Sequence, residues 1–426
     1  MKKVLIITYY WPPAGGPGVQ RWLKFVKYLR SFDIDPIVYI PENPNYPVKD
    51  PAFLKEVPED ITIIKQPIFE PYGVASVFSK KKTNQISKGV ISSGSQSFIE
   101  KMMLWIRGNL FIPDARKFWI NPSVTYLSRY LEENNIDTII TTGPPHSLHL
   151  IGLKLKRQSG IKWIADFRDP WTTIGYHKEL KLTKNAAERH KELEHQVLNT
   201  ADQITVTSYT TKKEFEELTA QPIEVITNGY DVSYFESVTP DEGFTLAHIG
   251  SLLSGRNPLV LWEVLSELKK ESESFAKDLK INLVGVVSDV VVQSLKDYGL
   301  EASLSLQAYV THDEALKMQR ASQLLLLIEI DAKETQCIIP GKLFEYMAAE
   351  RPILAIGPDQ WDAAKIVRET NTGKTFVYDD KTRLKTAILE YYQAYKKASL
   401  KVHPIGLQKY SRKALTEHLS NVIKQL

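Results

Sequence analysis

The sequence has 426 residues, a length that exceeds one hydrophobic core and favours two or more domains. Its hydrophobic content of 43% and charged content of 24% are typical of a globular protein, and a net charge of only +4 argues against DNA or RNA binding. A single cysteine, Cys337, excludes an intrachain disulfide framework and indicates a reducing, cytoplasmic compartment. No stretch approaches the ~20 apolar residues that a membrane span needs.

Residues 1–238 are predicted to form an N-terminal domain built on a parallel sheet. Short apolar runs alternate there with helical patterns, as in successive βαβ units. The predicted strands cover 4–7, 37–40, 61–64, 138–142, 163–166, 204–207 and 224–226, and the predicted helices cover 19–29, 147–158 and 185–198.

The segment 75–130 interrupts this alternation with a basic, aromatic-rich insertion. Its nine lysines and arginines face only Glu100 and Asp114, and aromatic and aliphatic residues lie between them. Such a segment can lie on an anionic membrane surface. The other interpretation is a solvated insertion around one packed helix.

Two motifs of the first domain follow predicted strands. The glycine-rich loop Trp11–Arg21 lies between the first strand and the first helix, where backbone N–H groups can approach a phosphate; otherwise it is a plain turn. His146 follows the strand 138–142. Its functional interpretation is that it moves a proton or binds a sugar hydroxyl, and the other interpretation is a hydrogen-bonded cap.

A third motif ends the strand 163–166 with the charged residues Asp166, Arg168 and Asp169. Charges at the end of an apolar strand are costly to bury without partners. We therefore expect at least one carboxylate to face a reaction centre, although an Arg168–aspartate pair that holds the loop would also account for the motif.

Residues 239–408 repeat the alternation and are predicted to form a second domain. Strands are expected at 244–249, 280–284, 303–307, 323–328 and 352–356, and a helix at 258–270. An amphipathic helix is expected over 410–426. Two doubly wound sheets leave a cleft at the carboxyl ends of their strands, where ligands of such sheets bind.

The second domain carries two motifs suited to an anion. In the first, Gly250 and Arg256 belong to a loop after a strand, and arginine binds a diphosphate bidentately. In the second, Gly341 opens a helix, Lys342 lies at its N-terminus and Glu345 lies one turn on. The lysine and backbone donors favour an anion there, and the carboxylate can accept from ribose hydroxyls.

These residues resemble the GT-B fold and, within it, the retaining glycosyltransferases of family 4. The resemblance rests on the segment Gly341–Ala355, on Asn228–Asp231 and on the loop Gly15–Gly18. It implies two Rossmann-like doubly wound domains facing a cleft: an acceptor-binding domain over 1–238 and a nucleotide-sugar-binding domain over 239–408. A terminal helix over 409–426 would cross back to the first domain.

The resemblance also implies donor-binding residues. Gly16 would approach the donor diphosphate, Arg256 would bind it and Glu345 would hold the ribose, while Tyr309 and Val310 lie where the family's backbone reads the base. The family's second glutamate corresponds to Cys337 here, and its usual partner lysine is not evident; we expect Lys342 to compensate.

The family's catalytic histidine corresponds to the strand end that carries Asp166 and Asp169, so an aspartate replaces it. The expected reaction is a metal-independent transfer of a hexosyl group with retention, in cell-surface polysaccharide synthesis. The donor would be a UDP- or GDP-linked sugar used as substrate, with no cofactor.

The acceptor would be a saccharide or polyprenyl-linked saccharide, with the enzyme peripheral at the inner membrane face. Two alternatives remain open: a sugar-nucleotide epimerase on the same fold, and a catalytically silent sugar-nucleotide-binding protein.

Overall fold

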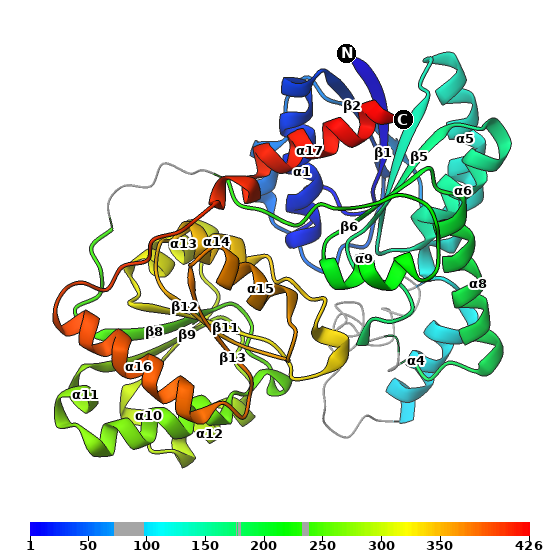
Figure 1. Cartoon of the computed structure of the whole chain (residues 1–426). Coiled ribbons are helices and arrows are strands. Elements are labelled where there is room, and N and C mark those ends of the chain that lie inside the picture. The colour runs from blue at the N-terminus through cyan, green and yellow to red at the C-terminus, as the bar shows by residue number, and fades with distance from the viewer. Residues whose placement is uncertain (72–97, 176, 178–179, 232–237) are drawn as a thin grey trace. The chain divides into compact units, whose positions relative to one another are not determined.

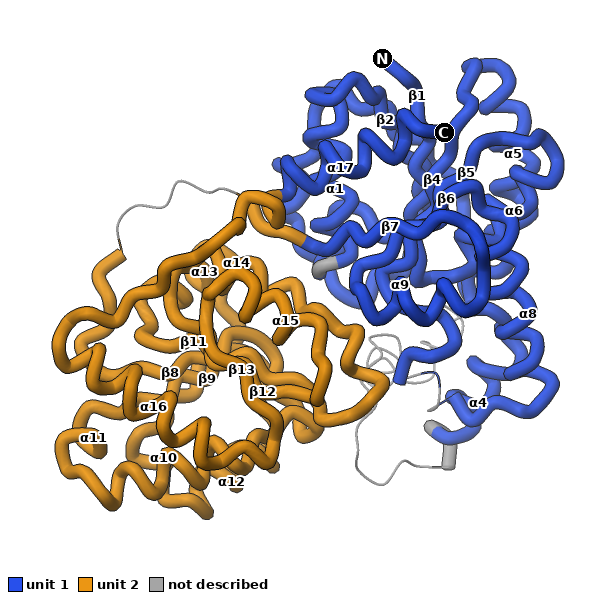
Figure 2. The backbone as a smooth tube through the Cα atoms, in the orientation of Figure 1, with its two compact units in different colours: residues 1–228, 412–426 blue, residues 229–411 orange. Residues whose placement is uncertain are grey.

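The computed structural model describes residues 1–71, 98–175, 177, 180–231 and 238–426. The chain forms two compact units, the first made of residues 1–228 and 412–426 and the second of residues 229–411 (Figure 2). The chain thus enters the second unit earlier than the boundary expected at 238.

Unit 1 contains a seven-stranded sheet in the order β3-β2-β1-β4-β5-β6-β7, and every pair in it is parallel. Leu5 of β1 lies between Ile37 of β2 and Ile139 of β4, and all three side chains are buried. The strands are β1 (Lys2–Ile7), β2 (Ile34–Pro41), β3 (Thr62–Gln66), β4 (Thr138–Gly143), β5 (Lys162–Phe167), β6 (Gln203–Val206) and β7 (Ile223–Val225).

Most helices of unit 1 bury apolar residues in the core around this sheet. In α1 (Pro17–Leu29), the predicted stripe of Trp22, Phe25, Val26 and Leu29 is buried. The others are α4 (Phe98–Leu110), α5 (Ile120–Glu133), α6 (Ser147–Ser159), α8 (Lys184–Thr200), α9 (Tyr209–Glu216) and α17 (Arg412–Gln425).

The C-terminal helix α17 lies beside α1, although nearly the whole chain separates them in sequence (Figure 1). Its apolar residues Leu415, Leu419, Val422 and Ile423 are buried in the core of unit 1. The unit therefore needs both ends of the chain to complete its core.

Unit 2 contains a six-stranded parallel sheet in the order β10-β9-β8-β11-β12-β13. Its strands are β8 (Phe244–Ile249), β9 (Leu279–Val284), β10 (Leu304–Gln307), β11 (Leu324–Ile328), β12 (Ile353–Ile356) and β13 (Gly373–Phe376). Its helices are α10 (Leu259–Glu271), α11 (Glu273–Asp278), α12 (Asp289–Asp297), α13 (His312–Ala321), α14 (Lys342–Ala348), α15 (Asp362–Glu369) and α16 (Lys381–Lys396).

Alternate residues of β8 enter different cores. Phe244 and Leu246 pack in one cluster, whereas Ala247 and Ile249 pack in the other, as the period of two along a strand requires. His248 therefore points to the same face as Leu246, and it is buried in that position.

Part of the basic insertion lies outside the described residues, including Lys80, Lys81, Lys82 and Lys88. The described part begins with α4. Among the helices that the structure describes, none combines the length and apolarity needed to span a bilayer.

Candidate functional site

In unit 2, the candidate site gathers at the carboxyl end of β8. Gly250 has φ +123° and Gly285, after β9, has φ +113°, a region that side chains rarely allow. A Cβ on Gly285 would lie 3.0 Å from the carbonyl group of Gly250. The two loops therefore approach backbone to backbone, and both glycines are required for that approach.

Lys342 lies directly over Gly250. A Cβ on Gly250 would lie only 2.7 Å from the Lys342 ammonium, so the glycine leaves room for the cation. Lys342 Nζ is 3.1 Å from His248 Nε2 and forms no ion pair within the described part of the chain. Burial and, to a smaller extent, the positive charge of Arg256 lower the pKa of Lys342 to about 8, against the opposing effect of Glu329 and Glu345.

Arg256 is held by a carboxylate that sequence analysis did not assign to the site. Its Nε and Nη2 atoms donate to Glu329 Oε1 and Oε2 at 2.9 and 3.0 Å. Glu329 follows β11 and is completely buried. The pair orients the guanidinium and leaves its Nη1 side uninvolved in the bidentate contact. A carboxylate directly after an apolar strand was the signal in the sequence that could have revealed Glu329.

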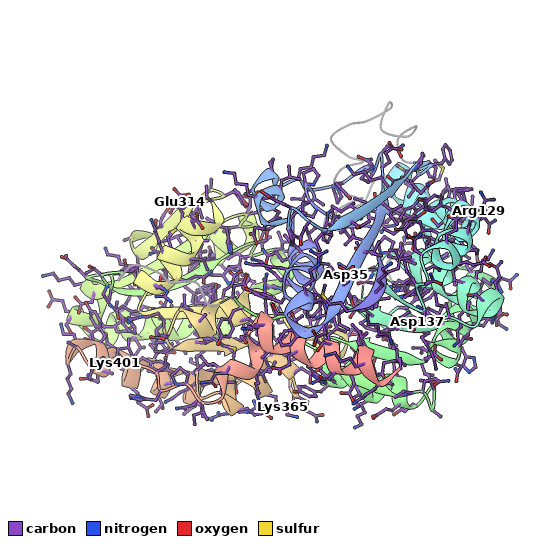
Figure 3. All side chains as sticks on the ribbon, turned by 90° about the horizontal axis from the view of Figure 1, so that it is seen from above. Asp35, Arg129, Asp137, Glu314, Lys365 and Lys401 are labelled. Carbon is purple, nitrogen blue, oxygen red and sulfur yellow. The ribbon has the colours of Figure 1, made fainter. Side chains whose placement is uncertain are left out.

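Glu345 lies one turn along α14, and its Oε2 accepts a hydrogen bond of 3.2 Å from Gln319 Nε2 on α13. Gln319 is 1% exposed. Helix α13 begins with a capping box, in which Thr311 Oγ1 accepts from the Glu314 N–H and Glu314 accepts from the Thr311 N–H. Glu314 is labelled in Figure 3. Gln319 therefore orients one oxygen of Glu345 from a well-anchored helix.

Other predicted donor residues are placed differently. Gly341 has φ −55°, a conformation open to any residue, and the seven-residue helix α14 is short. Anion binding at this site is therefore expected to depend more on the cationic side chains than on the N-terminus of this helix. Tyr309 is 83% exposed and Val310 packs on the second core of unit 2. Cys337 is buried, and its Sγ lies 3.6 Å from the Glu334 carbonyl oxygen.

In unit 1, Asp166 is the centre of a buried hydrogen-bond network. It accepts from Arg21 Nη2 at 2.8 Å, Trp22 Nε1 at 3.0 Å, Thr142 Oγ1 at 2.8 Å and Thr205 Oγ1 at 2.8 Å. Burial raises the pKa of Asp166, but Arg21 and the hydroxyl donors outweigh it and hold the pKa below its usual value. At 1% exposure the carboxylate is saturated, so the geometry favours a structural role over the predicted catalytic one.

Asp169, three residues on, has a different environment. It is half-buried, and its carboxylate has no hydrogen-bond partner among the described residues. Burial raises the pKa of Asp169, and Arg168 offsets this in part. Of the two predicted aspartates, Asp169 is therefore the one available to a ligand.

Arg168 connects this strand end to the glycine-rich loop. Its guanidinium donates to the carbonyl oxygens of Gly143 and Pro144, and it lies 5.6 Å from the centre of the Tyr10 ring. A Cβ on Gly18 would lie 1.8 Å from Arg168 Nη1, so this glycine makes room for the arginine. The expected Arg168–aspartate ion pair is replaced by carbonyl contacts, and Asp166 pairs with Arg21 instead.

Gly16 begins α1 with φ +102°, and no heavy atom lies within 4 Å of the Cβ it would carry. Its backbone conformation, rather than crowding, requires glycine there. The predicted diphosphate contact of Gly16 stays a prediction.

His146 is buried against aromatic rings. Its ring stacks on Trp171 at 4.7 Å with a 5° angle, and neither nitrogen has a partner among the described residues. Burial, together with nearby His149 and Arg168, lowers the pKa of His146 well below its usual value. Although it occupies the position before α6, its side chain forms no cap; Asp114 accepts from the Ser147 N–H instead. A neutral, 5% exposed ring favours packing over the predicted proton transfer.

Comparison with known proteins supports this architecture. Residues 92–234 match the model of the family described as Glycosyltransferase Family 4. No curated protein matches the sequence significantly.

Solved structures match the whole chain. Anabaena HepE in complex with UDP matches with a TM-score of 0.61 and 14% identity, over 100% of both chains. The lipopolysaccharide outer core galactosyltransferase WaaB matches at 0.59 and 13%, also over 100% of both. A putative UDP-N-acetylglucosamine 2-epimerase from Listeria monocytogenes matches at 0.54 and 13%, over 100% of this chain and 96% of the other.

The fold and site thus define a protein of the GT-B class, with two Rossmann-like units. The expected resemblance to glycosyltransferases of family 4 is confirmed over residues 92–234, and the expected fold is confirmed over the whole chain.

Proposed function

We propose that the chain transfers a hexosyl group from a nucleotide-sugar donor, held by unit 2, to a saccharide or lipid-linked saccharide, with retention at the anomeric carbon. The observation that carries this proposal is that Lys342 lies over the Gly250 backbone and close enough to Arg256 for the two positive charges to interact, with Glu345 one turn further on α14. Two cations at one strand end suit a diphosphate, and an oriented carboxylate suits a ribose.

In this reaction the nucleoside diphosphate leaves from the anomeric carbon and carries the developing negative charge. Arg256 and Lys342 would stabilise that charge without a metal ion, since fixed positive groups act strongly where water is excluded. HepE structures contain UDP and UDP-glucose, which favours a uridine donor over the guanosine alternative.

Asp169 is the residue we assign to the acceptor or to the transferred sugar. Its carboxylate faces no protein partner among the described residues, and its raised pKa reflects a partly dehydrated setting. Cell-surface polysaccharide synthesis is supported by the likeness to WaaB, which acts on the lipopolysaccharide outer core.

The acceptor side also includes a candidate membrane surface, which we call the α4 patch and define by five exposed residues. They are Phe69, Met102, Trp105, Leu110 and Phe118, exposed by 61, 46, 42, 55 and 43%. Lys101 is exposed on the same helix, and Lys117 Nζ lies 5.4 Å from the ring centre of Phe118. Apolar side chains flanked by lysines favour an anionic lipid surface at the inner face of the membrane.

The donor assignment is tested by measuring thermal stabilisation with UDP, GDP, CMP and dTDP sugars, for wild type and Glu345→Ala. A ligand at about 100 times its Kd adds about 2.7 kcal/mol of stability. We expect one nucleotide class to stabilise the wild type and Glu345→Ala to lose that effect. No stabilisation by any of them would contradict a donor site in unit 2.

An epimerase is the second candidate, because the Listeria epimerase shares the fold. Products distinguish the two. An epimerase converts the sugar nucleotide without an acceptor, whereas a transferase needs one for turnover beyond slow hydrolysis. A catalytically silent protein would bind the nucleotide and form neither product.

A further inference from the structure

We propose that His248 is a positioning residue that holds the Lys342 ammonium at the donor site as a neutral hydrogen-bond acceptor. The inference rests on the proposed function of unit 2, and it concerns a residue to which sequence analysis gave no role at the donor site. His248 lies on β8 and is 1% exposed.

The backbone determines the tautomer of His248. Its Nδ1 is 3.0 Å from the carbonyl oxygen of Leu326 on β11. A carbonyl oxygen can only accept, so Nδ1 carries the hydrogen and Nε2 of the neutral ring is left as an acceptor. The neighbouring strand thereby decides which nitrogen faces the site.

Nε2 lies 3.1 Å from Lys342 Nζ and 3.3 Å from the Ser251 carbonyl oxygen. The Ser251 carbonyl oxygen and the neutral Nε2 are both acceptors. The hydrogen in the hydrogen bond between Lys342 and His248 therefore belongs to the Lys342 ammonium. Burial lowers the pKa of His248 well below its usual value, and the charge of Lys342 lowers it further, which keeps the ring neutral.

A neutral acceptor has a consequence that a carboxylate would not have. A neutral acceptor orients the ammonium group but does not neutralise its positive charge. Of the two carboxylates close enough to raise the pKa of Lys342, Glu329 already pairs with Arg256 and Glu345 accepts from Gln319. The remaining N–H groups and the full positive charge of Lys342 are therefore available to an incoming diphosphate.

The matched pair of variants is His248→Phe and His248→Gln. Both lose the hydrogen bond to Leu326, but glutamine can place an amide oxygen near the position of Nε2, whereas phenylalanine cannot. Their urea unfolding midpoints report any general loss of stability. Affinity for UDP and GDP is measured by calorimetry in wild type, both variants, Lys342→Met and His248→Phe with Lys342→Met.

We expect His248→Phe to weaken nucleotide binding about tenfold and His248→Gln to retain most of it, since a hydrogen bond to a charged group is lost only in the first. In the Lys342→Met background, His248→Phe should have no further effect. Independent, multiplicative losses in this cycle would overturn the inference.

The pH dependence gives a second readout. Wild-type affinity should fall as the pH rises through about 8, where Lys342 loses its proton. Without an acceptor the buried ammonium is less stable, so the decline in His248→Phe should begin at lower pH.

A measurement without nucleotide separates this inference from the proposed function. The acetylation rate of Lys342 by acetic anhydride, followed against pH by peptide mass spectrometry, reports its pKa directly. We expect a lower midpoint in His248→Phe than in wild type and His248→Gln. An unchanged midpoint would overturn the role of His248 even if the wild type binds nucleotide. If the midpoint of Lys342 acetylation shifts in His248→Phe but the wild type binds no nucleotide, only the donor assignment is overturned.

Discussion

At the scale of single residues, two aspartates three positions apart have opposite environments. Asp166 accepts hydrogen bonds from four residues in the core of unit 1, whereas Asp169 accepts none from the described residues. The pKa shifts follow this difference, downward for Asp166 and upward for Asp169. The pair therefore offers a direct comparison of a structural and a functional carboxylate.

Asp169→Asn should lower the rate of sugar transfer about a hundredfold, because a misplaced reacting group costs about that much. Nucleotide affinity should stay unchanged, since the side chains assigned to the donor, those of Arg256, Lys342 and Glu345, are in unit 2. The measurement is kcat with a saturating donor alongside calorimetric nucleotide binding. Full activity of Asp169→Asn would exclude this carboxylate from the reaction.

Asp166→Asn should destabilise the protein by ~3–5 kcal/mol at pH 7, because it breaks a buried ion pair and leaves Arg21 unpaired. The folded pKa of Asp166 is depressed, so its stabilisation is present above the unfolded value of about 3.9 and is lost as the pH falls through the folded value. Urea unfolding should show the difference between variant and wild type shrinking below about pH 4. Equal stability at pH 7 would contradict the network.

At the scale of elements, α4 and the turn after it expose several large apolar side chains. The ring centres of Phe69 and Phe118 lie 5.5 Å apart, although both side chains are largely exposed. From the sequence alone, the insertion could dock on a membrane or be a solvated helix, and vesicle binding distinguishes the two.

Replacing Met102 and Trp105 by serine should reduce binding to vesicles containing anionic lipid, because the apolar face can no longer enter the interface. Flotation or sedimentation with vesicles of varied phosphatidylserine content measures the effect. Leu389→Ser on α16, also an exposed apolar residue at 38%, is the matched control. Equal vesicle binding by wild type and the double variant would favour the solvated interpretation.

At the scale of the whole molecule, the first unit contains both ends of the chain. Helix α17 contributes Leu415, Leu419, Val422 and Ile423 to a core otherwise built from residues before Asn228. The last residues of the sequence therefore stabilise the first sheet.

Ile423→Ala should destabilise unit 1 by ~2–5 kcal/mol, because Ile423 is completely buried and the truncation leaves a cavity. Hydrogen exchange followed by mass spectrometry should show the loss of protection in unit 1, with unit 2 protected as in wild type. Lys424→Ala, one residue on, is a surface control. Uniform loss over both units would contradict this division of the chain.

Periodicity and strand-end polarity were sufficient to predict much of this architecture. The alternation of apolar runs with amphipathic segments predicted twelve of the thirteen strands, because a strand buried on both faces must be apolar wherever it occurs. The edge strand β13 was missed, since Gly373–Phe376 is short and only Phe376 is buried. The helices α5, α9, α11, α12, α13, α15 and α16 were also not predicted.

Local sequence also located the candidate sites, because ligands of parallel sheets bind at the carboxyl ends of strands. What only the tertiary structure decided is which polar residue faces which. Asp166 and Asp169 follow the same strand, yet Arg21, from a helix far away in sequence, neutralises only the first. The pairing of His248, Gln319 and Glu329 with their partners could not be predicted from the sequence either, since each acts on a residue 26 to 94 positions away. The charge state and orientation of a buried group depend on such distant neighbours, and their approach is determined by packing rather than by the local pattern.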